Sequence, residues 1–234
     1  MQLQDKVILV TGGSMGIGLE TAKQLHAKGA LVVINARDEA RLKMVGEKYE
    51  MMTVQGDVAN ESDVQRIYAF IMERYGRLDA LINNAGYGYF DSLENMDVEK
   101  FNRVFATNVT GAMLMAREAA KIFIRQNKGN IVNISSTAGT KGFAGGTAYS
   151  ATKFALKAMT QCWQAELRKH NVRVILINPS EVQTEFVINS GREARAFNPT
   201  KLKAEDIAHT ICAALEMEDR GFITELTVFA TNPQ

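Results

Sequence analysis

A phenol and an amine stand four residues apart in the segment TAYSATKF, residues 147–154. If this segment is helical, Tyr149 and Lys153 lie one turn apart on the same helix face. An ammonium group beside a phenol lowers the pKa of the phenol from about 10, toward the range of a general acid. A tyrosine and a lysine at this spacing also occur by chance on solvated helices, so the pair alone does not establish a catalytic site.

Composition excludes several classes of function. Lys and Arg total 27 against 26 Asp and Glu, a net charge of +1, which gives no excess field to attract nucleic acid or an anionic membrane. No apolar run reaches the roughly 20 residues of a membrane span, and the run at residues 7–10 is too short for a signal-peptide core. Two cysteines outside any CxxC pattern and three isolated histidines argue against a disulfide framework or a metal site. We therefore expect a cytoplasmic protein without nucleic-acid or membrane partners.

Short β-branched runs alternate with longer helical patterns along the whole chain. The expected strands include KVILV, ALVVIN, MMTVQ, LDALIN, NIVNIS, VRVILIN and a final FITELTVF, and the expected helices include a long one over residues 98–125. Apolar strands separated by helices are typical of a parallel sheet that is covered on both faces. The pattern predicts an α/β doubly wound Rossmann fold with a seven-stranded, mostly parallel sheet, in one domain over residues 1–234.

A glycine-rich turn joins the first expected strand to the first helix. In TGGSMGIGLE, Gly12, Gly16 and Gly18 permit close approach of backbone N–H groups to a pyrophosphate at the positive end of a helix. The spacing is one residue wider than the usual GxGxxG pattern. Its place between a strand and a helix is nevertheless the context that a dinucleotide site requires.

The end of the second expected strand bears on the choice of cofactor. In VVINARDEA the strand ends at Ala36 without a carboxylate to bind the adenosine ribose of NAD, and Arg37 follows with a guanidinium suited to a 2′-phosphate. Asp38 is better explained as the cap of the next helix. The sequence thus favours NADP(H) over NAD(H), with an ordinary surface role for Arg37 as the alternative.

Two expected helices are more apolar than one-sided packing requires. Apolar residues cover most of the circumference over residues 101–124 and 149–167. Deep burial within one chain is one explanation. We favour the other, that these helices also pack against a second copy, and so expect a homodimer or homotetramer.

The motifs taken together resemble the short-chain dehydrogenase/reductase family, in its single-domain branch similar to 3-oxoacyl carrier-protein reductases. The resemblance covers nearly the whole chain. It depends on seven segments in order: TGGSMGIG, GDV, NNAG, NVTG, ISS, YSATK and NPSEVQT. The wider glycine spacing is that family's own variant.

The resemblance implies a role for each catalytic group. Tyr149 is implied as the general acid and base, and Lys153 as the group that binds the nicotinamide ribose and lowers the pKa of Tyr149. Ser136 is implied as a hydrogen-bond donor to the substrate carbonyl, and Ser135 is the alternative, disfavoured by its spacing to Tyr149. Asn108 is implied to hold a water against the lysine for proton supply.

The resemblance also implies the cofactor contacts. The phosphate turn would be lined by Gly12, Ser14, Met15, Gly16, Ile17 and Gly18. Asp57 would receive the adenine amino group, with Val58 beside the ring, and Arg37 is the candidate already named for the 2′-phosphate. The adenosine-side ribose would be lined by Asn84, Ala85 and Gly86, and the nicotinamide end by Pro179, Val182 and Thr184.

Three features depart from the family pattern. Met15 stands where a basic residue is common in NADP-preferring members, Ser180 replaces a glycine, and the usual Asp-Gly-Gly tail is missing. The interpretation is an NADP(H)-dependent carbonyl reductase or alcohol dehydrogenase acting on a small-molecule ketone or secondary alcohol. The alternatives are an NAD-dependent alcohol dehydrogenase and a non-catalytic sensor of the nicotinamide cofactor.

Overall fold

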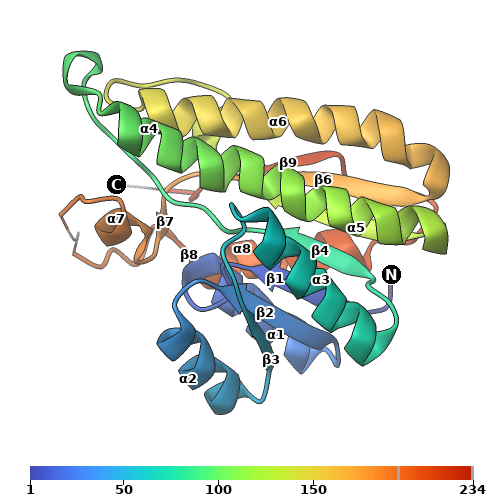
Figure 1. The fold of residues 1–234 in the computed structure, drawn as a ribbon. Helices are drawn as coiled ribbons and strands as arrows, with labels where there is room; N and C mark the ends of the chain where they lie inside the picture. Colours follow the sequence, from blue (N-terminus) through green and yellow to red (C-terminus); the bar gives the residue numbers. More distant parts are fainter. Residues whose placement is uncertain (194–195, 233–234) are drawn as a thin grey trace.

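Seven parallel strands form one sheet with helices on both faces (Figure 1), in a computed structural model that describes residues 1–193 and 196–232. The strands are β1 (Val7–Thr11), β2 (Leu31–Ala36), β3 (Met52–Gln55), β4 (Ala80–Asn83), β5 (Gly129–Ile134), β6 (Val172–Pro179) and β9 (Glu225–Val228). Their order is β3-β2-β1-β4-β5-β6-β9, and every neighbouring pair is parallel. The predicted doubly wound Rossmann fold is confirmed.

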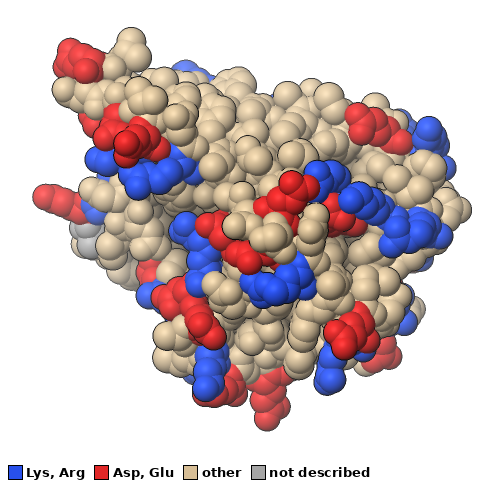
Figure 2. Space-filling model, viewed as in Figure 1, with Lys and Arg blue, Asp and Glu red and all other residues tan. Residues whose placement is uncertain are grey.

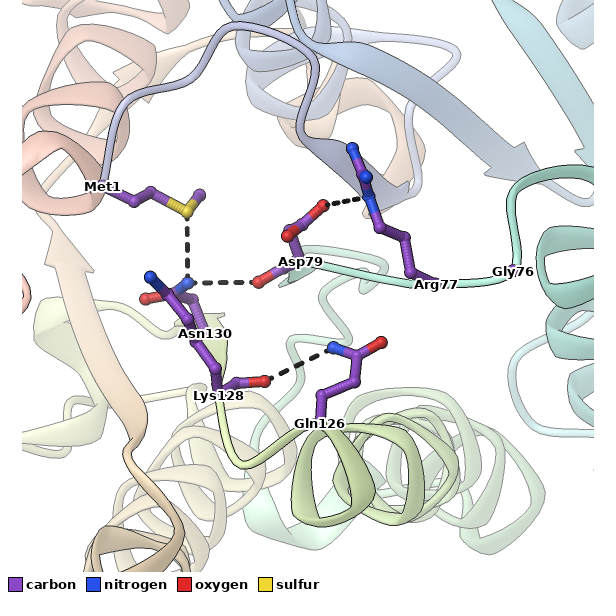
Figure 3. Close-up of a pocket in the computed structure, with 7 residues that line it drawn as sticks. All are labelled: Met1, Gly76, Arg77, Asp79, Gln126, Lys128 and Asn130. Carbon is purple, nitrogen blue, oxygen red and sulfur yellow. Dashed lines mark hydrogen bonds and ion pairs between the residues drawn. The ribbon is translucent and has the colours of Figure 1, made fainter.

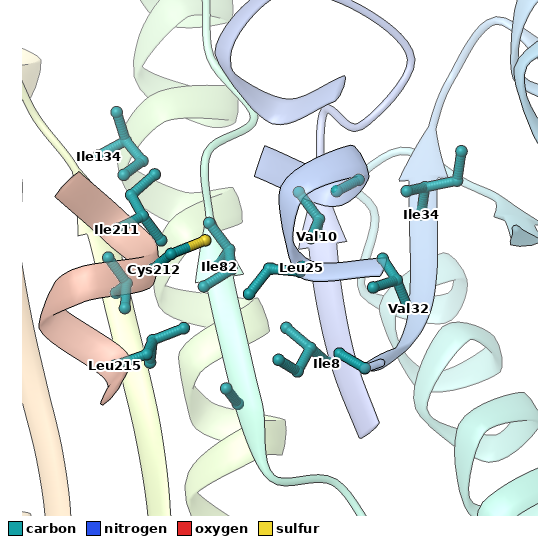
Figure 4. Packing of buried hydrophobic residues seen from close by; sticks show 14 of the residues in the cluster. Ile8, Val10, Leu25, Val32, Ile34, Ile82, Ile134, Ile211, Cys212 and Leu215 are labelled. Carbon is teal, nitrogen blue, oxygen red and sulfur yellow. The ribbon is translucent and has the colours of Figure 1, made fainter. Parts of the chain in front are cut away.

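Side chains of alternate residues on each strand face opposite layers of helices, because side chains alternate across a strand. Ile8 and Val10 of β1 belong to one core cluster, and Val7 and Leu9 to the other. The first cluster, drawn in Figure 4, includes residues of α1 (Gly16–Ala27), α2 (Glu39–Tyr49) and α8 (Ala204–Glu216). The second includes residues of α3 (Glu61–Tyr75), α5 (Ala112–Gln126) and α6 (Thr147–Leu167).

The direction of the strand order reverses between β1 and β4. From β1 the chain passes through α1 to β2 on one side, whereas β4 and β5 extend the sheet on the other side. In open parallel sheets such a reversal leaves a crevice at the carboxyl ends of the strands, where ligands bind. The motifs that follow β1, β4, β5 and β6 therefore meet at one edge of the sheet.

Asp38 begins α2 as the sequence suggests. Its side chain accepts a hydrogen bond from the backbone N–H of Arg41 at 3.0 Å, which satisfies one of the donors left free at a helix start. The prediction that Asp38 is a helix cap is confirmed.

The single long helix expected over residues 98–125 is interrupted. It consists of α4 (Val98–Phe105), a π-helical turn η2 (Ala106–Gly111) and α5. The last strand is also shorter than the expected segment FITELTVF. Only Glu225–Val228 pair with β6, opposite residues 176–179. Within the irregular stretch after β6 lie two short paired strands, β7 (Val182–Gln183) and β8 (Leu202–Lys203), and the short helix α7 (Phe186–Asn189). Residues 194–195 of that stretch lie outside the described part of the chain.

Candidate active site

The glycine-rich turn has the shape that a pyrophosphate needs. Gly12 and Gly16 have φ angles of +63° and +53°, in the left-handed region that glycine tolerates. A Cβ on Gly18 would lie 2.3 Å from the carbonyl oxygen of Gly12, so only glycine fits there. Met15 precedes α1 without capping it by a side chain, which leaves the start of the helix open to an anion. The turn thus fits the diphosphate of a dinucleotide.

Asn84 joins the segment after β4 to this turn. Its amide nitrogen donates to the carbonyl oxygens of Thr11 at 2.9 Å and Gly12 at 3.3 Å. The Thr11 hydroxyl oxygen in turn accepts from the backbone N–H groups of Asn84 and Ala85, both at 3.0 Å. Asn84, expected to line the adenosine-side ribose, therefore has its amide engaged in supporting the glycine turn.

Two arginines lie near the end of β2, where the sequence analysis expected the adenosine end of a cofactor, and the sequence indicated one of them. Arg37 is 62% exposed, and its Nη1 lies 3.9 Å from a carboxylate oxygen of Asp57. Arg41, on the first turn of α2, forms an ion pair at 2.7 Å with Glu185, next to α7, and also donates to the sulfur of Met15. Arg41 was missed because only the fold brings α2 beside α7 and the glycine turn.

Val58, expected beside the adenine ring, lies largely in the core. It is 4% exposed, and its side chain packs closely against Gly111 of η2. Little of its surface is free for a ligand, whereas Asp57 remains partly exposed next to it. Ser14 is nearly buried, and Ile17 packs against the first core cluster.

The predicted catalytic groups come together at the carboxyl end of β5. Tyr149 and Lys153 lie on α6, with the lysine Nζ 5.6 Å from the centroid of the tyrosine ring. Lys153 is 7% exposed, and its Nζ donates to the carbonyl oxygen of Ile134 at 2.9 Å. Ser136 follows β5, close enough to Tyr149 that its hydroxyl affects the ionisation of the phenol.

Burial dominates the ionisation of both groups on α6. It raises the pKa of Tyr149 to about 12, while the Ser136 hydroxyl and the Arg192 guanidinium act in the lowering direction. Burial also lowers the pKa of Lys153 to about 8. The expectation that Lys153 lowers the pKa of Tyr149 is not met in this structure, because burial raises that pKa and the lowering contributions come from Ser136 and Arg192. A phenol with so high a pKa stays protonated at neutral pH.

The two candidate serines have different environments. The hydroxyl of Ser135 is buried and donates to the carbonyl oxygen of Lys153 at 3.3 Å. The hydroxyl oxygen of Ser136 accepts from the backbone N–H of Ala138 at 3.1 Å, which leaves its proton free for another acceptor. Of the two, only Ser136 has a hydroxyl that faces Tyr149 with a donor to spare.

Asn108 is buried in η2 and has partners for its amide. Its oxygen accepts from the backbone N–H of Tyr87 at 3.1 Å, and its nitrogen donates to the Tyr87 carbonyl at 2.9 Å and the Thr152 hydroxyl at 3.1 Å. These bonds join the segment after β4 to α6, with Gly86 packed against the same side chain. The amide thus has a structural function, which is to join these two segments. Its role in proton supply stays a prediction.

The segment after β6 brings Thr184 to the glycine turn. Thr184 lies against Gly16, where a Cβ would be 3.5 Å from that of the threonine. Pro179 is the last residue of β6, and Val182, in β7, packs against the first core cluster. Of these three residues, Thr184 lies directly against the glycine turn.

Two phenylalanines that the sequence analysis did not single out lie against the tyrosine, and a third lies against one of them. The ring centroids of Phe90 and Phe186 lie 5.3 and 5.4 Å from that of Tyr149, and Phe143 lies 6.1 Å from Phe90. We call Phe90, Phe143 and Phe186 the phenylalanine cluster. They come from the segment after β4, the segment before α6, and α7. No spacing in the sequence relates these segments, so no local signal could have found the cluster.

A second concavity lies at the opposite, amino-terminal edge of the sheet (Figure 3). Its lining includes Met1, Arg77, Asp79, Lys128 and Asn130. Asp79 pairs with Arg77 at 3.2 Å, and the Asn130 amide donates to the Asp79 carbonyl at 3.1 Å. Arg77, Asp79 and Asn130 are thus bonded to one another, and the predicted site residues lie at the other edge of the sheet.

Comparison with known proteins identifies the family of the chain. A sequence model of the short chain dehydrogenase family matches residues 6–195. The chain belongs to the short-chain dehydrogenase family. The matched residues run from β1 past α7 and so include the glycine turn, the segment after β4 and the Ser136, Tyr149 and Lys153 group.

Relatives within the short-chain dehydrogenase family cover almost the full chain. An uncharacterized oxidoreductase of Staphylococcus aureus strain USA300 is 32% identical over 232 residues, which span 97% of each protein. A serine dehydrogenase solved with NADP⁺ is 27% identical, with a TM-score of 0.90 over 95% of this chain and 94% of the other. A 3-ketoacyl-(acyl-carrier-protein) reductase of Brucella melitensis solved with NADH is 27% identical, with a TM-score of 0.90 over 98% of both chains.

Proposed function

We propose that this protein is an NADP(H)-dependent carbonyl reductase that interconverts a ketone and a secondary alcohol. The observation that carries the proposal is the meeting of Ser136, Tyr149 and Lys153 at the edge of the sheet that also bears the glycine turn. Membership of an oxidoreductase family and relatives solved with NADP⁺ or NADH support a nicotinamide cofactor.

In this proposal each side chain acts on one atom of the reaction. When bound, the nicotinamide cofactor would supply or accept the hydride. Ser136 donates a hydrogen bond to the carbonyl oxygen, which stabilises the negative charge that develops there. Tyr149 donates its proton to that oxygen as the carbonyl is reduced.

Lys153 and Asn108 complete the proton supply in this proposal. Lys153 would bind the hydroxyls of the nicotinamide ribose, exchanging its present acceptor, the carbonyl oxygen of Ile134. Asn108 would position a water that returns a proton toward the lysine. The phenylalanine cluster would exclude bulk water from the reacting carbonyl, which strengthens the hydrogen bonds made there.

The decisive experiment removes the phenol. With NADPH and a panel of ketones, Tyr149→Phe should lower turnover by about 10²- to 10⁴-fold, the usual contribution of a general acid, while cofactor binding persists. Tyr75→Phe, on α3, is the matched control and should keep the wild-type rate. A Tyr149→Phe protein with an undiminished rate would refute the role of the phenol. Binding of NADPH without turnover of any ketone would favour a cofactor sensor.

The NADP preference is proposed from Arg37 and Arg41. Both flank the end of β2, where no carboxylate follows Ala36 to bind a ribose hydroxyl. A charge-assisted hydrogen bond contributes about 1.5 to 3 kcal/mol, so Arg37→Ala should weaken kcat/KM for NADPH by roughly tenfold to a hundredfold and leave that for NADH unchanged. Equal use of both cofactors before and after the change would instead support an NAD-linked dehydrogenase.

A further inference from the structure

The guanidinium of Arg192 lies beside Phe90 and forms no ion pair with the part of the chain that the structure describes. Its central carbon is 4.2 Å from the centroid of the Phe90 ring. Its Nε is buried and has no hydrogen-bond acceptor, and no residue within 1–193 or 196–232 forms an ion pair with the side chain. A buried N–H of a cation that lacks an acceptor costs free energy unless a ligand supplies one.

This guanidinium is close to the reacting group. Phe90 contacts both Arg192 and Tyr149, since its ring centroid is also 5.3 Å from that of the tyrosine. The positive charge of Arg192 is felt at the phenol, where it acts to lower the pKa of Tyr149. Arg192 therefore lies within reach of a small molecule whose carbonyl is bound by Tyr149 and Ser136.

We propose that Arg192 binds a carboxylate of the substrate, so that the ketone reduced at Tyr149 is an oxo acid and the alcohol a hydroxy acid. This inference rests on the proposed function. The planar fork of a guanidinium matches the two oxygens of a carboxylate, and the rings of the phenylalanine cluster would cover a short carbon chain between the two ends.

A carboxylate fits better than a phosphate group. A phosphate monoester carries close to two negative charges at neutral pH. Lys153, the other cation beside Tyr149, has its Nζ bonded to the Ile134 carbonyl and its pKa lowered to about 8. One guanidinium against aromatic rings matches a single negative charge.

The test compares charged and neutral forms of the same ketones. Pyruvate, acetoacetate and levulinate, each with its methyl ester, are assayed with NADPH. The proteins are the wild type, Arg192→Met, Arg192→Lys and a control, Arg168→Met. The control changes an exposed arginine after α6. We expect wild-type protein to prefer at least one acid over its ester. Arg192→Met should raise KM for that acid by roughly tenfold to a hundredfold, with little change for the ester. Arg192→Lys should restore part of the loss, and Arg168→Met should behave as wild type.

A binding measurement separates this inference from the proposed function. Calorimetry on NADP⁺-loaded protein compares the binding of butanoate and butanamide. Butanoate should bind and butanamide should not, and Arg192→Met should abolish the binding of butanoate. Reduction of esters and acids with equal kcat/KM would overturn the inference while leaving the reductase intact. Arg192→Met that weakens NADP⁺ binding instead would assign the guanidinium to the cofactor and also overturn it. Butanoate binding without turnover of any ketone would keep the carboxylate site and reject the reductase.

Discussion

At the scale of single residues, burial sets the ionisation of the site more than the neighbouring charges do. Lys153 is 7% exposed, and its pKa is lowered to about 8, while the pKa of Tyr149 is raised to about 12. Both shifts favour the uncharged form, as desolvation requires. The structure therefore places a protonated phenol beside a lysine that loses its proton near pH 8.

The lowered pKa of Lys153 predicts a pH dependence of stability. Between about pH 8 and the ordinary lysine value of 10.5, the unfolded chain binds more protons than the folded one, so the free energy of unfolding rises with pH. The free energy of unfolding is measured by chemical denaturation of cofactor-free wild-type protein and of Lys153→Met. The difference between the two values should be constant below pH 8. Between pH 8 and pH 10.5 the wild-type value should rise by a few kcal/mol relative to that of Lys153→Met. A difference independent of pH would contradict the shift.

At the scale of secondary-structure elements, the π-helical turn η2 holds the site together. Its Asn108 bonds both backbone groups of Tyr87 in the segment after β4 and the Thr152 hydroxyl on α6. A π-helical turn inserts one residue relative to regular helix and often occurs at functional sites. Here it places a polar side chain at the junction of two elements that carry site residues.

The hydrogen bonds at η2 predict that replacing Asn108 lowers the free energy of unfolding more than replacing an exposed asparagine does. Asn108→Ala leaves the partly buried backbone groups of Tyr87 without these partners and should lower the free energy of unfolding by about 1 to 3 kcal/mol. Asn102→Ala, on the exposed side of α4, should change it by less than about 0.5 kcal/mol. Urea denaturation followed by circular dichroism measures both. Equal losses for the two variants would show that the bonds of Asn108 carry no particular weight.

At the scale of the whole molecule, charge is unevenly placed on the surface. Figure 2 shows Lys, Arg, Asp and Glu of both signs intermixed, with a largely uncharged area over the middle of α4, α5 and α6. Ile124 of α5 and Phe154 of α6 are 41% and 45% exposed. These are the helices that the sequence analysis expected to contact a second copy, and homo-oligomerisation through them stays a prediction.

No helix in the described ranges is long and apolar enough to cross a membrane. The expected cytoplasmic location stays a prediction.

An interface on α6 predicts that a charge at Phe154 separates subunits. Wild-type protein at micromolar concentration should scatter light as a dimer or tetramer, and Phe154→Glu should scatter as a monomer, because burying an unpaired carboxylate in an apolar interface is costly. Met44→Glu, at an exposed position on α2, is the control and should leave the assembly unchanged. A wild-type protein that is monomeric throughout this range would contradict the interface.

Several features were predictable from the sequence because they depend on local order. The alternation of strands and helices, the glycine turn between β1 and α1, the cap at Asp38 and the helical spacing of Tyr149 and Lys153 involve residues close together in the chain. Parallel strands then bring the ends of β1, β4 and β5 to one edge of the sheet. Strand ends and the interruption at η2 were missed, because long-range pairing and packing determine them.

Only the tertiary structure decided how these groups meet and how they ionise. The pKa values of Tyr149 and Lys153 follow from desolvation, which depends on segments distant in the chain that cover them. In the same way, Arg41 meets Glu185 and Arg192 meets Phe90 across about a hundred or more residues of sequence, through packing that no spacing encodes. The sequence by itself thus determined the fold and the chemical groups, and packing between distant segments determined their charge state and the shape of the substrate site.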